Sequence, residues 1–304
     1  MTRPKLAIVV ALTDPGLPHL GEGLARFSEE AGPSGEVLLL DASSMPDAQT
    51  LAGRFANVRV ISRPPRRLAP RLWRDGLLAT DADLVALTTA TMVPSPGWLA
   101  ALRDQLETTV AAGVGGPIEP GPGLSPTDRA VALLRYSSYF PRSTTPSFDP
   151  PGDNALYRRA ALIEVEAAWL DGFWEVDVHR ALLAQGHTLA TAEEAVVSFR
   201  GGVGLGAMAR QRFQHARVYG ASRAQGLHPA ARWARATTSP LVPPLLAARA
   251  IRNLRSGGRP LAPWLPAVPE FIGLASSWAV GEAIGTVFDA HQASRTTLTR
   301  RELA

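Results

Sequence analysis

The amino-acid sequence predicts an α/β protein with a largely parallel sheet, followed by a helical C-terminal region. Two observations support this fold class. Short apolar, β-branched or leucine-rich runs alternate with helix-like stretches up to Thr91, which is the strand, crossover helix, strand pattern of a parallel sheet. The chain has 304 residues, enough for one large domain with an appendage.

The first elements can be placed in order. Strands are expected at residues 6–12, 36–40, 58–61 and 82–88, with helices at 19–31 and 71–79. The fourth strand ends at the triplet Thr89-Ala90-Thr91. Two stretches rich in Pro and Gly, 115–126 and 141–152, are expected to be loops, and loops of this length in a compact domain usually line a functional site.

Helices dominate the second half. One is expected at residues 158–166, and a stronger one begins near Trp174 and ends at Gly186, a residue suited to the position after a helix C-cap. Pro243-Pro244 opens an amphipathic helix with apolar residues on one face and arginines on the other.

The last apolar stretch, residues 271–288, is interrupted by Glu282 and several glycines. We expect a hairpin or a helix lying on protein or membrane rather than a simple span, because no stretch reaches about 18 uninterrupted apolar residues.

Charge is distributed unevenly along the chain. The net charge is only +4, yet residues 195–269 contain no Asp or Glu while eleven arginines fall between Arg200 and Arg259. Such a segment predicts an anionic partner, either the phosphates of a substrate or a lipid surface. Nucleic acid is not expected because no known binding motif accompanies the charge. The alternative is a solvated basic surface, since arginine is almost the only cation in this chain.

Cysteine is absent, which excludes disulfides and thiolate metal sites and agrees with a cytoplasmic location.

Four segments carry recognisable motifs. Residues 83–99 join the fourth strand and Thr-Ala-Thr to Pro-Ser-Pro-Gly-Trp-Leu; residues 152–159 read Gly-Asp-Asn-Ala-Leu-Tyr-Arg-Arg; residues 171–180 contain Gly-Phe-Trp-Glu-Val-Asp; and residues 210–217 begin Arg-Gln-Arg-Phe. In order and spacing they resemble family 2 glycosyltransferases over about residues 5–225.

The resemblance implies a GT-A fold, a Rossmann-like mixed sheet flanked by helices. It divides the chain into a glycosyltransferase domain, residues 1–225, and a helical region, residues 226–304, that associates with a membrane or forms a homodimer. It also implies inverting transfer of a sugar from a nucleotide-sugar donor to a glycan, lipid-linked or cell-envelope acceptor. The expected place is the cytoplasm, at the inner face of the plasma membrane.

Such a reaction needs a cationic group for the leaving diphosphate and a carboxylate for the acceptor proton. The positions where the resembled family carries its Asp-X-Asp metal ligands hold Thr89 and Thr91, and neutral hydroxyls bind Mg²⁺ or Mn²⁺ less strongly. A site without a metal cofactor is therefore favoured, with Mg²⁺ or Mn²⁺ left as the alternative. Arg210, Arg212 and Arg217 are expected to hold the diphosphate instead.

The catalytic base is expected to be Glu175, with Asp177 as the alternative, because the resembled family has adjacent acids here and this chain has Glu-Val-Asp. His179, four residues after Glu175, shares its helix face and could orient the carboxylate. The alternative is a Glu that interacts with the helix dipole, beside a solvent-facing His.

The remaining candidates concern the donor and acceptor. Asp41 ends the second strand, where its carboxylate can accept hydrogen bonds from a nucleoside or form an Asx turn; Asp14 is its companion after the first strand. Asp153 and Asn154 are expected to contact sugar or to form a turn. Trp174 is expected to pack and also to border the sugar, whereas Trp98 is a packing residue.

Two other functions compete. A non-catalytic glycosyltransferase-like protein that binds a nucleotide or glycan would explain Thr89 and Thr91. A nucleotidyltransferase is disfavoured because no Gly-rich phosphate loop follows the first strand.

Overall fold

In the computed structural model the chain forms two compact units, and residues 5–14, 17–141 and 149–289 are described. Unit 1 comprises Met1–Leu124 and Ser138–Gly202, and unit 2 comprises Ser125–Ser137 and Val203–Ala304. The predicted boundary at residue 225 differs from this division, because the helix that precedes it packs with the C-terminal helices.

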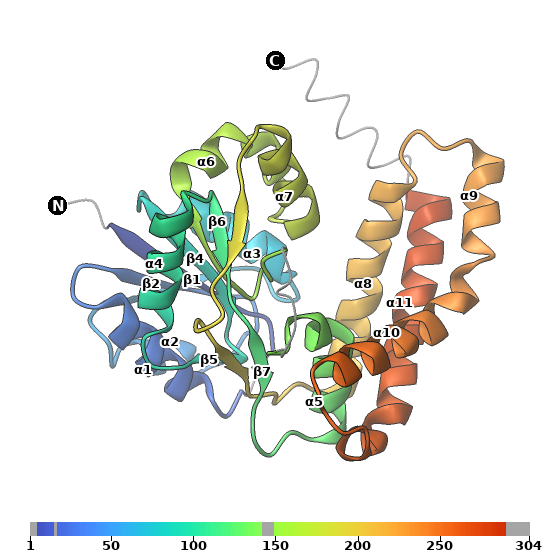
Figure 1. The fold of residues 1–304 in the computed structure, drawn as a ribbon, viewed down its shortest axis with the longest axis horizontal. Helices are drawn as coiled ribbons and strands as arrows, with labels where there is room; N and C mark the ends of the chain where they lie inside the picture. Colours follow the sequence, from blue (N-terminus) through green and yellow to red (C-terminus); the bar gives the residue numbers. More distant parts are fainter. Residues whose placement is uncertain (1–4, 15–16, 142–148, 290–304) are drawn as a thin grey trace. The chain divides into compact units, whose positions relative to one another are not determined.

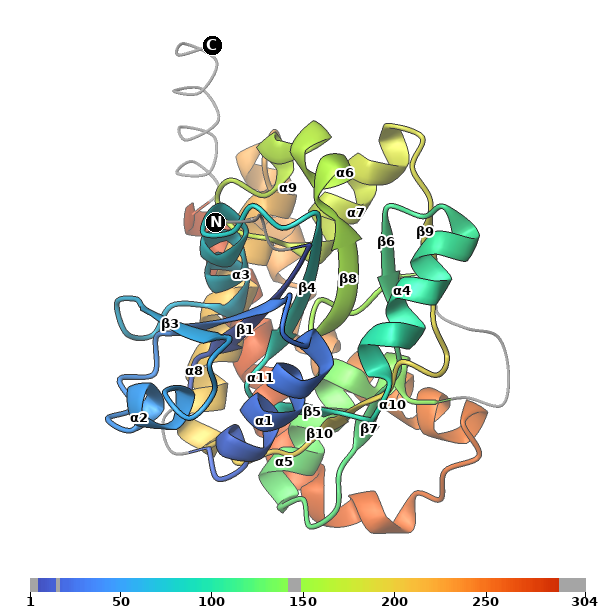
Figure 2. The same ribbon diagram turned by 90° about the vertical axis from the view of Figure 1, so that its left-hand side faces the viewer.

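The main sheet of unit 1 has seven strands in the order β3-β2-β1-β4-β8-β6-β9 (Figures 1 and 2). Strands β1 to β4 run parallel where they pair, whereas β8 is antiparallel to both of its neighbours. This mixed sheet confirms the predicted fold class. The strands are β1 Leu6–Leu12, β2 Glu36–Asp41, β3 Val58–Ser62, β4 Leu84–Thr89, β6 Gly113–Gly115, β8 Asn154–Arg158 and β9 Leu189–Thr191.

Helices cover both faces of this sheet. They are α1 Leu20–Ala31, α2 Ala48–Ala52, α3 Ala69–Leu78, α4 Trp98–Thr109, α6 Arg159–Glu164 and α7 Glu175–Ala184. Val9 and Ala11 of β1 share a core with α3, α6 and α7. Strand side chains alternate, so Ile8 and Val10 point to the opposite face, where α1 and α4 pack (Figure 2). A Cβ on Gly76 of α3 would lie 2.2 Å from Val9 Cγ1, so only glycine allows this close approach.

A second, three-stranded sheet in unit 1 was not predicted. It consists of β5 Met92–Pro94, β10 Val197–Phe199 and β7 Ile118–Pro120, in that order. The expected loop at 115–126 was therefore wrong in part. Both β5 and β7 pair with β10, about a hundred residues away from β5, and a short strand stabilised by so distant a partner leaves little local pattern.

Of the other expected loop, residues 142–148 lie outside the described residues, and 149–152 lead directly into β8.

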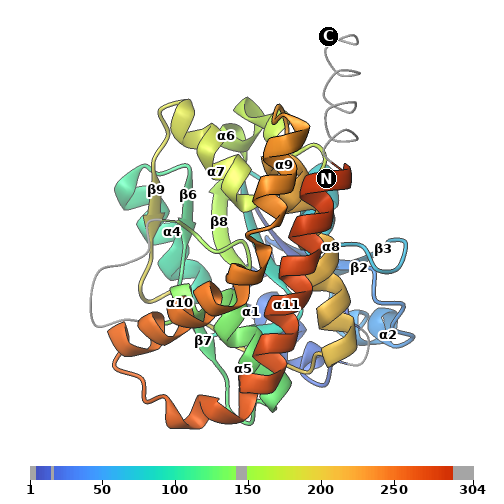
Figure 3. The same cartoon turned by 90° about the vertical axis from the view of Figure 1, so that its right-hand side faces the viewer.

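Unit 2 is helical. Its elements are α5 Pro126–Val131, η1 Ala132–Tyr136, α8 Leu205–Arg223, α9 Pro229–Ala236, η4 Ser239–Leu241, α10 Val242–Ser256, η5 Ala262–Ala267, α11 Val268–Ile284 and η6 Gly285–Asp289. The short helix η2 Ser137–Tyr139 begins with the last residue of the first segment of unit 2, and η3 Glu166–Ala168 belongs to unit 1. Helices α8 and α11 lie side by side (Figures 1 and 3). Cβ atoms on Gly281 and Gly285 would lie 2.3 Å and 2.0 Å from the carbonyl oxygens of Phe213 and Arg217. Glycine therefore permits backbone contact between the helices.

The apolar C-terminal stretch is helical, as one of the two expected alternatives proposed. Among the described residues, Ala262–Asp289 is long and apolar enough by length and composition to cross a membrane, with mean hydropathy 1.4, although 39% of that window is buried. The sequence analysis did not predict a helix of this length and hydropathy, because it required about 18 uninterrupted apolar residues. A core helix passes the same test.

The α8–α11 contact predicts opposite effects of two similar substitutions. Gly281→Ala should lower the free energy of unfolding by about 1–3 kcal/mol, because the new methyl group overlaps the Phe213 carbonyl. Gly273→Ala, in the same helix with nothing within 4 Å, should raise it by up to about 1 kcal/mol through helix propensity. Urea unfolding measures both. Equal effects would contradict the close packing.

Candidate active site

Three predicted site residues of unit 1, Asp41, Thr89 and Glu175, lie at one edge of the main sheet, where the parallel strands end. The register places Asp41 opposite Leu12 and Thr89 opposite Ala11. Because adjacent strands are about 4.8 Å apart, Asp41 and Thr89 lie about 10 Å apart across β1. Strand β8 begins at the same edge, with Asn154 opposite Thr88. In open α/β sheets the carboxyl ends of the strands are where ligands bind.

Asp41 is positioned by a local turn. Its Oδ1 accepts hydrogen bonds from the amide (2.8 Å) and the hydroxyl (2.7 Å) of Ser43. This is the predicted Asx turn, but Oδ2 makes no hydrogen bond within the described part of the chain. The turn therefore fixes the carboxylate and leaves one oxygen for a ligand. Asp14, buried just after β1, accepts a hydrogen bond from the Thr13 hydroxyl (2.7 Å).

Thr89 and Thr91 contact each other, with 3.0 Å between their hydroxyl oxygens. No group of three His, Cys, Asp or Glu side chains that could hold a metal ion occurs among the described residues. Two neutral hydroxyls that hydrogen-bond to each other do not form a donor set for Mg²⁺ or Mn²⁺.

Glu175 is the first residue of α7, and its position depends on Gly152. Its Oε1 accepts a hydrogen bond from the Gly152 amide (3.2 Å), and a Cβ on that glycine would lie 2.6 Å from Glu175 Cγ. Since Gly152 precedes Asn154 by two residues, Glu175 lies at the same sheet edge as Thr89. Asp177, by contrast, makes an ion pair of 3.3 Å with Arg180 and its side chain is 45% exposed.

His179 does not orient Glu175 as expected. Its Nε2 lies 2.8 Å from the Tyr157 hydroxyl, and its Nδ1 is hydrogen-bonded to Asp149. Both ring nitrogens are thereby occupied, so the imidazole has none left for Glu175. The solvent-facing alternative is also wrong, because the residue is only 3% exposed. Helical spacing alone could not distinguish these environments.

The chain Asp149–His179–Tyr157 links the segment before β8, helix α7 and β8 itself. Sequence reasoning missed it, although Tyr157 belongs to the quoted Tyr-Arg-Arg run. Burial raises the pKa of Tyr157 well above its ordinary value, and the charges of Glu175 and Asp149 raise it further. The hydroxyl therefore stays protonated, beside the candidate base.

The side chain of Asn154 links three other segments of unit 1. It is fully buried, accepts a hydrogen bond from the Trp98 ring nitrogen (2.7 Å) and donates to the carbonyls of Pro117 (2.9 Å) and Ala195 (2.8 Å). These contacts are structural, not those expected of a sugar ligand. Trp98 is also fully buried, which confirms its packing role.

Two further residues, Asp153 and Trp174, are candidates for the acceptor side, and that role stays a prediction. Asp153 is buried at the start of β8, and Trp174 is half-buried at the N-cap of α7.

The expected arginine clamp lies in unit 2, and the fold uses two of its members. Arg217 donates two hydrogen bonds to Asp289 (2.8 and 2.9 Å). Arg212 is 6% exposed, with its guanidinium 5.7 Å from the centre of the Trp278 ring. Only Arg210 is exposed. The expectation missed these partners because both lie far along the chain, beyond the acid-free segment.

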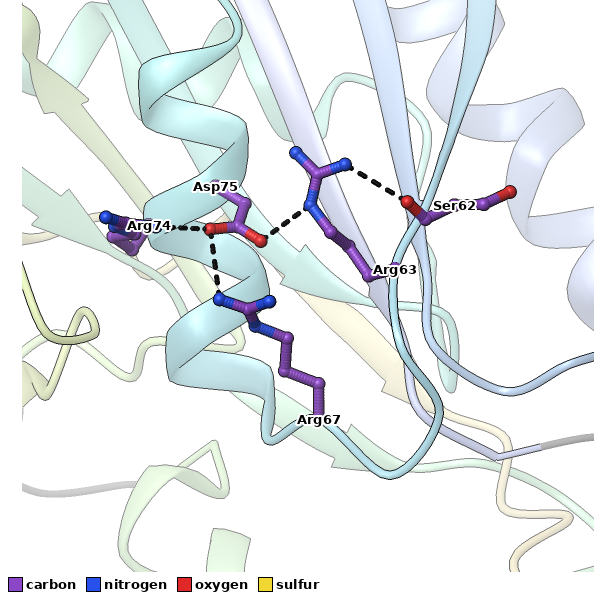
Figure 4. Close-up of polar contacts among 5 residues, drawn as sticks. All are labelled: Ser62, Arg63, Arg67, Arg74 and Asp75. Atoms are coloured by element: carbon purple, nitrogen blue, oxygen red, sulfur yellow. Dashed lines mark hydrogen bonds and ion pairs between the residues drawn. The ribbon is translucent and has the colours of Figure 1, made fainter.

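A different arginine group lies in unit 1 and was not predicted. Arg63, Arg67 and Arg74 surround the carboxylate of Asp75, at 2.7, 3.6 and 2.8 Å (Figure 4). The side chain of Asp75 is 4% exposed, and those of the arginines about 30%. Burial alone would raise the pKa of Asp75, but hydrogen bonds from Arg74 and Arg63 and the charges of Arg67 and Arg63 lower it overall. We call these four residues the α3 cluster.

No protein-family model matches the chain. No curated protein matches it either. Among solved structures, the mannosyltransferase PcManGT from Pyrobaculum calidifontis, in complex with GDP-Man and Mn²⁺, is similar with a TM-score of 0.55 and 17% identity, covering 95% of this chain and 88% of that one. A crystal structure of a mycobacterial protein gives a TM-score of 0.43 and 17% identity over 69% and 72% of the two chains. The first similarity shows that this chain shares the fold of a glycosyltransferase.

The buried His179–Tyr157 hydrogen bond predicts energetic coupling. His179→Phe should lower the free energy of unfolding by about 2 kcal/mol, because it leaves the Tyr157 hydroxyl buried without its partner. The double variant His179→Phe with Tyr157→Phe should recover part of the lost free energy of unfolding, because the unpaired hydroxyl is then absent. Denaturant unfolding of the two single variants and the double variant tests this. Strictly additive losses would contradict the coupling.

The α3 cluster predicts a pH dependence of stability. A carboxylate whose pKa is lowered by folding stabilises the protein above its unfolded pKa, about 3.9, and that contribution is lost as the pH falls through the folded value. Asp75→Asn should therefore cost about 2 kcal/mol at pH 7, less than for a fully buried pair because the arginines contact water. The difference from wild type should shrink at pH 3. Asp104→Asn, on the exposed face of α4, is the control. A cost of Asp75→Asn that is independent of pH would contradict this account.

Proposed function

We propose that this protein is an inverting glycosyltransferase that moves a sugar from a nucleotide-sugar donor to an acceptor hydroxyl without a metal held by paired carboxylates. The observation that carries the proposal is the meeting of Asp41, Thr89 and Glu175 at one sheet edge, in a fold shared with a glycosyltransferase. The reaction needs one residue that binds the donor nucleoside and another that acts as the base. Asp41 and Glu175 are the candidates for these two roles.

The donor nucleoside is assigned to Asp41. Its Oδ2 can accept a hydrogen bond from a ribose hydroxyl or a base N–H, while the Ser43 turn holds the carboxylate in place. The similar PcManGT structure contains GDP-Man, which makes guanosine and mannose the first donor components to test. The hydroxyls of Thr89 and Thr91 can donate hydrogen bonds to the ligand but add no charge.

Glu175 is assigned the role of base. The acceptor oxygen forms a bond to the anomeric carbon from the side opposite the leaving group, and the bond between that carbon and the diphosphate oxygen breaks. The acceptor proton passes to a Glu175 oxygen, and the diphosphate leaves with the electron pair. The Gly152 amide fixes the carboxylate for this task. Asp177, paired with Arg180 and 45% exposed at its side chain, is the alternative base.

We further propose a lipid-linked or cell-envelope acceptor at the inner face of the plasma membrane. Unit 2 by itself combines the acid-free arginine segment with exposed apolar side chains, a composition that favours an anionic lipid surface. The most exposed of these are Trp233, Leu241, Leu245, Leu265 and Phe288. A homodimer would cover the same side chains, and sedimentation in the absence of detergent separates the two.

A non-catalytic glycan- or nucleotide-binding protein is the second candidate. The mutual hydrogen bond of Thr89 and Thr91 favours it, because these residues occupy the place of the metal ligands of the resembled family.

Substitution of the two acids tests the reaction. Glu175→Gln should leave binding of a nucleotide sugar within a few-fold of wild type and reduce sugar transfer at least about 100-fold, because the amide cannot accept the proton. Asp177→Asn is the matched control and should retain most activity. Calorimetry and transfer assays, each in Mn²⁺ and in EDTA, make the measurement. The reverse pattern would make Asp177 the base, and binding without turnover in wild type would favour the non-catalytic alternative.

A further inference from the structure

The α3 cluster has more positive charge than its fold requires. Three guanidinium groups converge on one carboxylate, so three positive charges and one negative charge leave an excess of two. One arginine would suffice to neutralise Asp75. Holding like charges together costs energy, and the remaining pairs gain little at partly exposed positions. The excess charge is therefore the feature that needs an explanation.

The hydrogen-bonding capacity of the cluster is also largely unused. Arg63 donates to Asp75 and to the Ser62 carbonyl, and Arg74 donates to Asp75. Arg67 makes only an ion pair, at 3.6 Å, and the Nε atoms of Arg67 and Arg74 are buried without a hydrogen-bond partner in the described residues, which leaves the terminal N–H groups as the donors that water reaches. Guanidinium groups fixed by a carboxylate on one side and reached by water on the other can bind a phosphate through several N–H groups.

The backbone connects the cluster to both parts of the candidate site. The Arg63 amide donates to the Asp41 carbonyl (2.7 Å), and the Arg66 amide donates to the Ala42 carbonyl (3.1 Å). The loop before α3 is thus attached to the turn assigned to the nucleoside. At the start of α3, the Pro70 carbonyl accepts from the amide of Phe173 (2.8 Å), two residues before Glu175.

We propose that the α3 cluster is an anion site that binds the phosphate groups of the donor nucleotide directly, through Arg63, Arg67 and Arg74, with Asp75 as the residue that positions them. This assignment rests on the proposed function for the identity of the nucleotide. The α3 cluster takes the phosphate-binding role that the sequence predicts for the arginines of unit 2, of which Arg217 is paired with Asp289. Two fixed excess charges supply what a divalent ion would otherwise supply to a diphosphate.

Arg67 is the residue to substitute, because it makes the longest contact with Asp75 and no hydrogen bond, so its loss should disturb folding least. Arg67→Ala removes the charge and the donors, whereas Arg67→Lys keeps the charge and lacks the planar fork. Arg103→Ala, on the exposed face of α4, removes the same charge elsewhere in unit 1 and is the control. Circular dichroism and thermal unfolding establish that each variant is folded.

The experiment is calorimetric titration of the full chain, in EDTA, with inorganic pyrophosphate, GDP and UDP. Wild type should bind pyrophosphate and at least one nucleotide, and Arg67→Ala should weaken both about tenfold, the loss of one charge-assisted hydrogen bond. Arg67→Lys should fall between the two, and Arg103→Ala should match wild type.

The outcomes separate this proposal from the proposed function. Nucleotide binding that is unchanged in Arg67→Ala overturns the anion site and leaves the donor role standing. Arg67-dependent binding of pyrophosphate with no binding of GDP or UDP supports the anion site and overturns the nucleotide-sugar donor. No binding of any of the three ligands, or an equal loss in Arg103→Ala, overturns the anion site.

Discussion

The parallel pairing of strand β1 is the constraint on which the candidate site depends. All seven of its residues are buried, and it is hydrogen-bonded to β2 on one side and β4 on the other. A shift by one residue would turn every side chain of a strand to the other face and expose apolar surface, so the register is strongly fixed. The same register places Asp41 and Thr89 at the carboxyl ends of β2 and β4, offset by one residue along the strand direction. Their relative position is thus a by-product of burying an apolar strand, and no contact between the two is needed.

Two glycines determine where the charged side chains around this sheet lie. Gly76 lets α3 approach Val9 of β1, which fixes the helix that carries Arg74 and Asp75. Gly152 leaves room for the side chain of Glu175 and donates its amide to the same carboxylate. At both places a methyl group would move a charged side chain by displacing the element that carries it. The geometry of the charges therefore depends as much on the absence of side chains as on hydrogen bonds.

The sequence predicts the parts of this structure that local pattern controls. Apolar runs predict the four parallel strands, and helical spacing followed by a glycine predicts α7 and its end near Gly186. In the structure this glycine has a φ of 86°. The parts that depend on distant partners were missed. His179 looked like a partner of Glu175 because helical spacing is visible in sequence, whereas its contacts with Asp149 and Tyr157 lie 30 and 22 residues away.

The arginines illustrate the same limit for charge. A long acid-free segment suggested free cations, but Asp289 lies outside that segment and pairs with Arg217. The α3 cluster has no such compositional signal, because Asp75 lies directly beside Arg74 in sequence and the excess of charge arises only when the loop from Arg63 folds back on α3. Composition records how many charges a segment holds, whereas availability is decided by tertiary pairing.

On the proposed function, the threonine pair and the α3 cluster become two halves of one electrostatic arrangement. A divalent ion brings two positive charges within a short distance of the phosphate oxygens, and two carboxylates hold it there. Removing both carboxylates removes two negative charges that would repel a diphosphate. A site with Thr89 and Thr91 then needs less cationic charge to bind the same group, and an excess of two on the α3 cluster is of the right size. Threonines without a bound metal and an excess of arginine charge are therefore physically consistent with each other, whereas either alone would leave the phosphate charge poorly balanced.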